Sequence, residues 1–197
     1  MNPPPISLQQ PLRRFAKSRL ALSTVVTTLI ILVIAVLLAG VVSYFAINVT
    51  STRVQEESIV LAKQHVWYDA TSGNTQAAIM VINTGGRDIV IDRLTVRGQE
   101  CDWSNVYYNA TSNSIVSDFY YSTLSDGCSI NIGTTPYVFE QATTDLTVKS
   151  GTTLIIYISN PDSISVGDVG LTVSVNIFTS QAMYYKETNV QGSNEIT

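Results

Sequence analysis

The N-terminal part of the chain carries one long hydrophobic run. No charged residue occurs between Arg19 and Arg53, and residues 29–42 are apolar apart from Gly40. A helix over residues 22–47 would be about 39 Å long, enough to cross the hydrocarbon core of a bilayer. A surface helix of a soluble protein normally has a polar face, and the centre of this run has none. The pattern predicts a helix that enters a membrane; a fully buried helix of a large soluble protein is the alternative.

Beyond Ile47 the helical pattern continues and becomes amphipathic. Apolar and small side chains fall on one face, and most of the charged ones lie elsewhere. We predict one helix from about Leu22 to about Gln64, whose second half is a stem packed against the protein's own body domain. The alternative is two helices with a break at Asn48-Val49-Thr50, where three poor helix formers meet.

From residue 66 onward the hydrophobic period changes to two, which is typical of half-buried strands. The clearest alternation covers residues 171–177, and further strands are predicted at 77–82, 89–96, 146–148 and 154–158. Turn residues separate them at 83–86, 149–151 and 160–162. We therefore predict an α+β fold: a long N-terminal hydrophobic α-helix over residues 22–65, then a small antiparallel, Ig-like β-sandwich over residues 66–197.

Residues 99–140 are less regular and rich in Ser, Asn, Thr and Tyr. We expect a long excursion with one or two irregular strands on the outer side of the domain. Its aromatic residues could bind glycans or a neighbouring subunit, because each offers an apolar face and a polar tip. They could equally be ordinary core and strand residues.

The charges are distributed unevenly along the chain. Four basic residues (Arg13, Arg14, Lys17 and Arg19) precede the hydrophobic run, and the first acidic residue is Glu56. The positive-inside rule keeps the basic segment in the cytoplasm and places the acidic body outside. An acidic body disfavours nucleic-acid binding, and 45% hydrophobic residues exclude disorder for most of the length. With 13% charged residues, a cytosolic globule is not expected.

A small residue, Ala21, separates the basic segment from the apolar run. The stretch "KSRLALSTVVTTLIILVIAVLLAG" resembles the class III signal peptide and N-terminal helix of archaeal type IV pilins and archaellins. The resemblance implies that a prepilin peptidase cuts between Ala21 and Leu22 and removes residues 1–21. Bacterial pilins carry a glutamate at the fifth mature position, where this chain has Val26, which favours the archaeal branch.

The same resemblance implies a structural function. The precursor would lie in the cytoplasmic membrane with its N-terminus inside. An assembly platform and its ATPase would then build a homopolymer, a helical cell-surface filament that adheres to surfaces or other cells. An archaellin of the swimming filament is the nearest alternative. A single-pass, membrane-anchored extracellular binding module is the alternative from a different class, and it would not polymerise.

Two cysteines and two glycosylation motifs lie beyond the expected cleavage site. Cys101 and Cys128 both fall in the body, and an even count in an oxidising compartment favours a disulfide between them. Two buried thiols or a metal site are the alternatives. The sequons begin at Asn48 and Asn109. Asn109 is the better candidate, because Asn48 falls on the helix near the membrane boundary.

No catalytic set is visible in the sequence. His65 is the only histidine, so a His-based metal cluster is excluded and a Ser-His-Asp triad would have to use this residue. We expect His65 to be a surface or packing residue on the stem. The chain has no Gly-rich phosphate-binding loop. We therefore expect neither an enzyme nor a cofactor.

Overall fold

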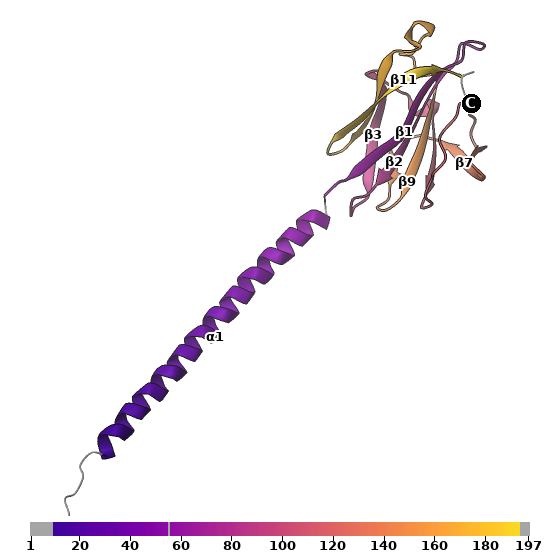
Figure 1. Cartoon of the computed structure of the whole chain (residues 1–197). Helices are drawn as coiled ribbons and strands as arrows, with labels where there is room; N and C mark the ends of the chain where they lie inside the picture. The colour runs from indigo at the N-terminus through magenta and orange to yellow at the C-terminus, as the bar shows by residue number, and fades with distance from the viewer. Residues whose placement is uncertain (1–9, 55, 194–197) are drawn as a thin grey trace, which may run out of the picture. The chain divides into compact units, whose positions relative to one another are not determined.

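The computed structural model describes residues 10–54 and 56–193, with side chains for residues 23–52 and 56–193. The chain folds into two compact units, of which the first ends at Thr52 and the second begins at Arg53 (Figure 1). Residues 1–9 of the expected signal peptide lie outside the described part.

The N-terminal element is the α-helix α1 (Gln10–Val54). Pro11 lies in its first turn, where a missing backbone N–H costs no hydrogen bond. The helix runs without interruption through Asn48, Val49 and Thr50, which excludes the alternative of a break there. Three threonines along the helix donate their hydroxyls to carbonyls of the preceding turn, so these polar groups are satisfied within the helix itself.

The predicted stem is wrong in its second half. The helix ends at Val54, and residues expected to extend it to Gln64 instead form strand β1 (Ile59–Tyr68). This strand pairs antiparallel with β2 (Thr75–Asn83) from end to end, with one irregularity between Ala62 and His65. Its β-branched and aromatic residues suit a strand, and the pairing supplies the backbone hydrogen bonds that a helix would have made.

The second unit contains an eleven-stranded sheet. Its other strands are β3 (Ile89–Val96), β4 (Gln99–Glu100), β5 (Val106–Thr111), β6 (Cys128–Ile132), β7 (Thr135–Gln141), β8 (Leu146–Val148), β9 (Thr153–Ser159), β10 (Thr172–Thr179) and β11 (Met183–Gly192). Two short 3-10 helices lie between strands, η1 (Trp103–Asn105) and η2 (Val166–Asp168). The strand order is β4-β3-β10-β11-β1-β2-β9-β5-β7-β6, and β8 pairs with β3.

The sheet is mostly antiparallel. The exception among its pairs is β1 with β11, which are parallel over Val66–Tyr68 and Val190–Gly192. An N-terminal apolar helix followed by a largely antiparallel sheet confirms the α+β class. The five strands predicted from alternation correspond to β2, β3, β8, β9 and β10. Residues 99–140 contain more regular structure than the one or two irregular strands expected. Strands β4, β5 and β6 lie within this range, and β7 ends one residue beyond it.

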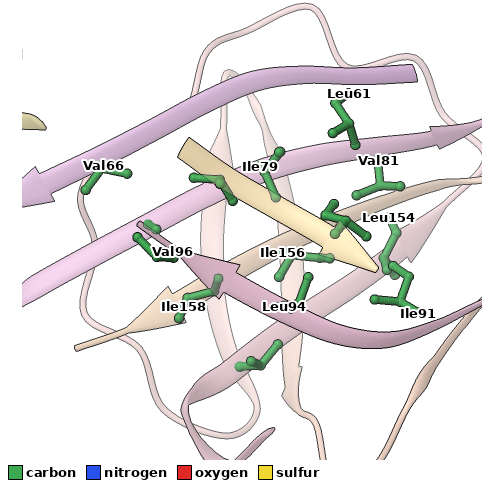
Figure 2. Close-up of a cluster of buried hydrophobic side chains, with 14 of the residues drawn as sticks. Leu61, Val66, Ile79, Val81, Ile91, Leu94, Val96, Leu154, Ile156 and Ile158 are labelled. Carbon is green, nitrogen blue, oxygen red and sulfur yellow. The ribbon is translucent and has the colours of Figure 1, made fainter. Parts of the chain in front are cut away.

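Strands β2 and β9 are buried on both faces. Alternate residues of β2 point to different clusters: Ile79 and Val81 belong to a first cluster, and Ala78 and Met80 to a second. Figure 2 shows the first cluster, where side chains of β1, β2, β3 and β9 converge. Burial on both faces explains why these strands read as continuous hydrophobic runs.

Candidate functional site on the apolar helix

The most unusual surface of the molecule is the apolar part of α1. Seventeen large hydrophobic side chains between Val25 and Val49 are 46–67% exposed in the single chain. They are Val25, Val26, Leu29, Ile30, Ile31, Leu32, Val33, Ile34, Val36, Leu37, Leu38, Val41, Val42, Tyr44, Phe45, Ile47 and Val49. They surround the helix instead of forming a stripe, because consecutive residues from 29 to 34 are all exposed. Contiguous apolar surface of this extent marks a contact with lipid or with other protein.

The segment also meets the chemical requirements of a membrane span. The stretch Ser23–Thr52 is the one helix in the described chain that is long and apolar enough to cross a membrane. At about 1.5 Å per residue it is roughly 45 Å long, against a hydrocarbon core of roughly 30 Å. Thr27 donates to the carbonyl of Ser23, and Thr28 to that of Val25, both at 2.9 Å. These hydroxyls therefore need no solvent partner inside lipid.

The expected cleavage site lies within the helix. The backbone of Ala21 and Leu22 is part of α1, as is that of the four preceding basic residues. The side chains of Ala21 and Leu22 lie outside the described part. The basic and apolar segments are thus consecutive turns of one helix, and the expected peptide bond joins them.

The second unit begins with a firmly held connection, which the sequence analysis did not single out. The carbonyl of Ser58 accepts from the backbone N–H groups of Thr84 at 2.9 Å and Gly85 at 3.1 Å. The hydroxyl of Thr179 donates to Glu57 Oε1 at 2.6 Å. A Cβ on Gly85 would lie 2.9 Å from the backbone oxygen of Glu56 and from the backbone nitrogen of Ser58. Residues 56–58 are therefore part of the β domain, and their backbone packs directly against Gly85.

The two sequons occupy different environments. Asn48 is exposed on α1, inside the stretch that is long enough to span a membrane. Asn109 lies on β5, where its Nδ2 donates to the carbonyl of Val138 at 2.7 Å and its Oδ1 is buried without a hydrogen-bond partner. Because a glycan attaches to Nδ2, modification of Asn109 in the folded domain would have to take place at a nitrogen that is already held against the carbonyl of Val138.

The expected disulfide between Cys101 and Cys128 is not formed, and both cysteines are free. Cys101 packs against the first hydrophobic cluster, and Cys128 packs against the second. The two clusters lie on opposite faces of β2 and β9, so the sheet separates the thiols. Burial raises the pKa of the Cys101 thiol to about 11, which keeps it protonated at neutral pH.

The single histidine lies on β1 and not on a helical stem. His65 stacks on Trp67 with ring centroids 5.1 Å apart, and its Nε2 lies 2.9 Å from Asp118 Oδ1. It is therefore a packing residue with a hydrogen-bonded tip. Among residues 23–52 and 56–193, no group of three or more His, Cys, Asp or Glu side chains is placed to hold a metal ion.

The β domain has an acidic composition. Residues 56–193 contain 14 Asp and Glu against six Lys and Arg. Three of these carboxylates have pKa values below the usual range. The pKa of Asp168 is lowered because Ser165 donates to it and Arg97 lies beside it, and that of Asp69 because Ser72 and the Thr71 N–H donate to it. The pKa of Asp118 is lowered because its hydrogen bonds with His65 and the Phe119 N–H outweigh its partial burial. Comparisons with known proteins add no assignment: no protein-family model matches the chain, and no curated protein matches it significantly.

Proposed function

We propose that this chain is the structural subunit of an archaeal type IV pilus-like filament at the cell surface. In this proposal α1 supplies the contacts between subunits, and the β domain, an Ig-like sandwich, forms the outer layer. Before assembly the precursor lies in the cytoplasmic membrane with its basic N-terminal segment inside. A prepilin peptidase then cuts between Ala21 and Leu22, and an assembly platform with its ATPase adds the subunit to the filament. Adhesion is the role that we assign to the filament.

The observation that carries the proposal is that the apolar helix is not used by the protein's own core. Both hydrophobic clusters are built from residues at position 59 or later, while every described side chain of α1 is exposed. Fully burying one Leu, Ile or Val side chain is worth about 1.5–3 kcal/mol. Fifteen side chains of these types, together with Tyr44 and Phe45, are at roughly half exposure on α1. They make a solvated monomer unfavourable by on the order of 20 kcal/mol. The helix therefore requires a partner, first lipid and then other copies.

The order of segments supports a filament more than a permanent anchor. The basic segment and Ala21 directly precede the apolar run, so one cut removes the charges that hold the helix in the membrane. The mature chain would begin with a bare hydrophobic helix that can leave the bilayer only into a bundle of similar helices. Within such a bundle the driving force is close packing, because lipid tails already shield apolar side chains from water. An acidic outer domain would keep adjacent filaments soluble.

The test is the N-terminus of the mature protein, measured by mass spectrometry in filaments sheared from the cells that produce it. We expect a chain that starts at Leu22. The variant Ala21→Trp should remain in the membrane at full length and give no filaments, because the peptidase selects a small residue before the cut. The same substitution upstream, Ala16→Trp, is the matched control and should be processed and assembled normally.

Three other results would each replace the proposal. A native protein that keeps Met1 and is confined to membranes as a lone subunit would be a single-pass, membrane-anchored binding module. A start beyond Ile47 would mean that the helix is removed from an ordinary secreted domain. If the native chain starts at Leu22 within filaments that rotate and drive swimming, the subunit would be an archaellin.

A further inference from the structure

The segment between β5 and β6 crosses one face of the domain without regular secondary structure. Residues 112–127, which we call the strap, contain no helix or strand. The side chain of Phe119 is 5% exposed and belongs to the second hydrophobic cluster, and Ile115, Tyr120, Tyr121 and Leu124 pack against that cluster. The strap therefore covers the second cluster, while the first cluster contains none of its residues.

Two side chains of β1 hold the first half of the strap. Lys63 Nζ donates to the carbonyls of Val116 at 2.6 Å and Ser117 at 2.7 Å. His65 Nε2 and Asp118 Oδ1 are 2.9 Å apart. Hydrogen bonds with a charged donor or acceptor are stronger than neutral ones. The first half of the strap is thus held by polar side-chain contacts and not by a backbone ladder.

Two further side chains hold the second half. Gln76 of β2 makes two hydrogen bonds with Ser122, donating from Nε2 to its carbonyl at 2.7 Å and accepting its N–H at 3.0 Å. Tyr157 of β9 donates its hydroxyl to the carbonyl of Tyr120 at 3.3 Å. Gln76 and Tyr157 are themselves buried. Four side chains from three neighbouring strands therefore take the place of strand pairing along the strap.

The backbone of β1 is distorted where it reaches the strap. Lys63 has φ of 52°, in the left-handed region that side chains other than glycine rarely adopt. It lies within the irregularity of the β1–β2 register between Ala62 and His65. A bulge of this kind redirects a side chain out of the normal alternation. Here the redirected side chain is the one that binds the strap carbonyls, so the strained conformation serves the contact.

Aromatic rings lie beneath the strap. Tyr157 is the centre of the group, with ring centroids 5.7 Å from Phe119, 5.2 Å from Phe139 and 6.5 Å from Trp67. Trp67 is 2% exposed and also stacks on His65. If the strap moved away, Phe119 would leave with it and the remaining aromatic surface would become accessible.

We propose that the strap is a conformational device that opens as a unit between Thr111 and Cys128 while the sheet stays folded. Opening would uncover the aromatic surface around Tyr157. The physical basis is the difference in how the two parts are held. The sheet is held by continuous strand pairing and by the first cluster. The strap is held by four side chains, by packing on one face and, at its C-terminal end, by two contacts with β7: the Gly127 N–H donates to the carbonyl of Phe139 at 2.9 Å, and Asp126 Oδ1 accepts the N–H of Gln141 at 3.0 Å. Segments held in this way open in local events of lower free energy than global unfolding.

The experiment is hydrogen exchange by NMR or mass spectrometry on the full chain in detergent micelles. The amide of Ser122, bonded to Gln76, reports on the strap, and the amides of β2 and β9 report on the sheet. In the native protein we expect the strap to exchange at least 100-fold faster than the sheet. Lys63→Met keeps most of the side-chain length but removes the ammonium donor, and it should accelerate strap exchange a further tenfold or more. Sheet amides should change by less than about twofold.

Lys186→Met is the matched control, because Lys186 is an exposed lysine on β11. It should leave strap and sheet exchange at native rates. A native strap that exchanges as slowly as β2 and β9 would show that it opens only with global unfolding and would overturn the proposal without any variant. Equal acceleration of strap and sheet in Lys63→Met would also overturn it, because Lys63 would then support the whole domain.

Discussion

Asn83 provides a quantitative test of how the end of β2 is held together. Its side chain is 1% exposed and uses both of its donors and its acceptor. Nδ2 donates to the carbonyls of Arg87 at 2.8 Å and Val148 at 3.0 Å, and Oδ1 accepts the N–H of Gly85 at 3.0 Å. One amide thus joins the turn after β2 to strand β8. The alternation of β2 does not by itself call for an asparagine at position 83. The role of Asn83 therefore comes from its contacts with the turn and with β8.

The variant Asn83→Ala would remove three hydrogen bonds and leave their partners without this amide. At about 1 kcal/mol per bond, the free energy of unfolding should fall by about 3 kcal/mol. For a protein of this size that corresponds to roughly 6–12 °C in Tm. Asn83→Asp should lose more, because a carboxylate would face the carbonyls of Arg87 and Val148.

The assay is urea unfolding of the full chain in micelles, followed by tryptophan fluorescence. Both tryptophans, Trp67 and Trp103, lie in the β domain, so the signal is independent of α1. The matched control is Asn131→Ala, an exposed asparagine on β6, for which we expect a change within about 0.5 kcal/mol. A loss below 1 kcal/mol for Asn83→Ala, or an equal loss for Asn131→Ala, would refute the reasoning.

Three further predictions follow from the β domain. Gly85→Ala should lower the free energy of unfolding by about 1–3 kcal/mol, because the added Cβ would lie 2.9 Å from two backbone atoms. Gly167→Ala is the control: the atom nearest to its added Cβ is 4.0 Å away, so the free energy of unfolding should change by less than about 0.5 kcal/mol. The pKa of the Asp168 carboxylate is lowered by hydrogen bonds from Ser165, so this group stabilises the fold above its unfolded pKa and loses that contribution as the pH falls through the lowered value. The Tm of Asp168→Asn should therefore decline less steeply between pH 7 and pH 3 than the Tm of the native chain. A parallel decline in the two proteins would contradict this prediction. Cys101 is not in a disulfide, so dithiothreitol should leave Tm unchanged, and a drop in Tm on reduction would contradict this prediction. Because the pKa of this thiol is raised to about 11, iodoacetamide at pH 8 should label it far more slowly than free cysteine.

Local sequence patterns were sufficient where the environment repeats regularly along a segment. The uncharged run after Arg19 could only be a helix in an apolar environment, and α1 covers it. The alternation at Val173, Val175 and Ile177 predicted a half-buried strand, and these three side chains are buried on β10. In both cases the environment repeats regularly along the segment, apolar all round in the helix and alternating between two faces in the strand, so the period can be read without knowing the partners.

Long-range partners decided the elements that were predicted wrongly. Residues 59–64 carry a mixed pattern that fits a helix face, and they became part of β1 because Thr75–Asn83 pair along the whole strand. The even cysteine count suggested a disulfide. In the structure Cys101 packs against the first hydrophobic cluster and Cys128 against the second, and β2 and β9 lie between the two clusters. Neither outcome is encoded in the spacing of the residues concerned.

The sequence by itself determined that this chain has a helix requiring an apolar environment and an acidic domain of strands. Hydrophobicity, charge and the period of the hydrophobic pattern depend only on residues close together in the chain, so they can be read from the sequence. Only the tertiary structure decided where the helix ends, which strands are buried on both faces, that the cysteines stay apart and that the strap is held by Lys63, His65, Gln76 and Tyr157. These features depend on contacts between residues far apart in the chain, whose free energies exist only once the sheet has formed.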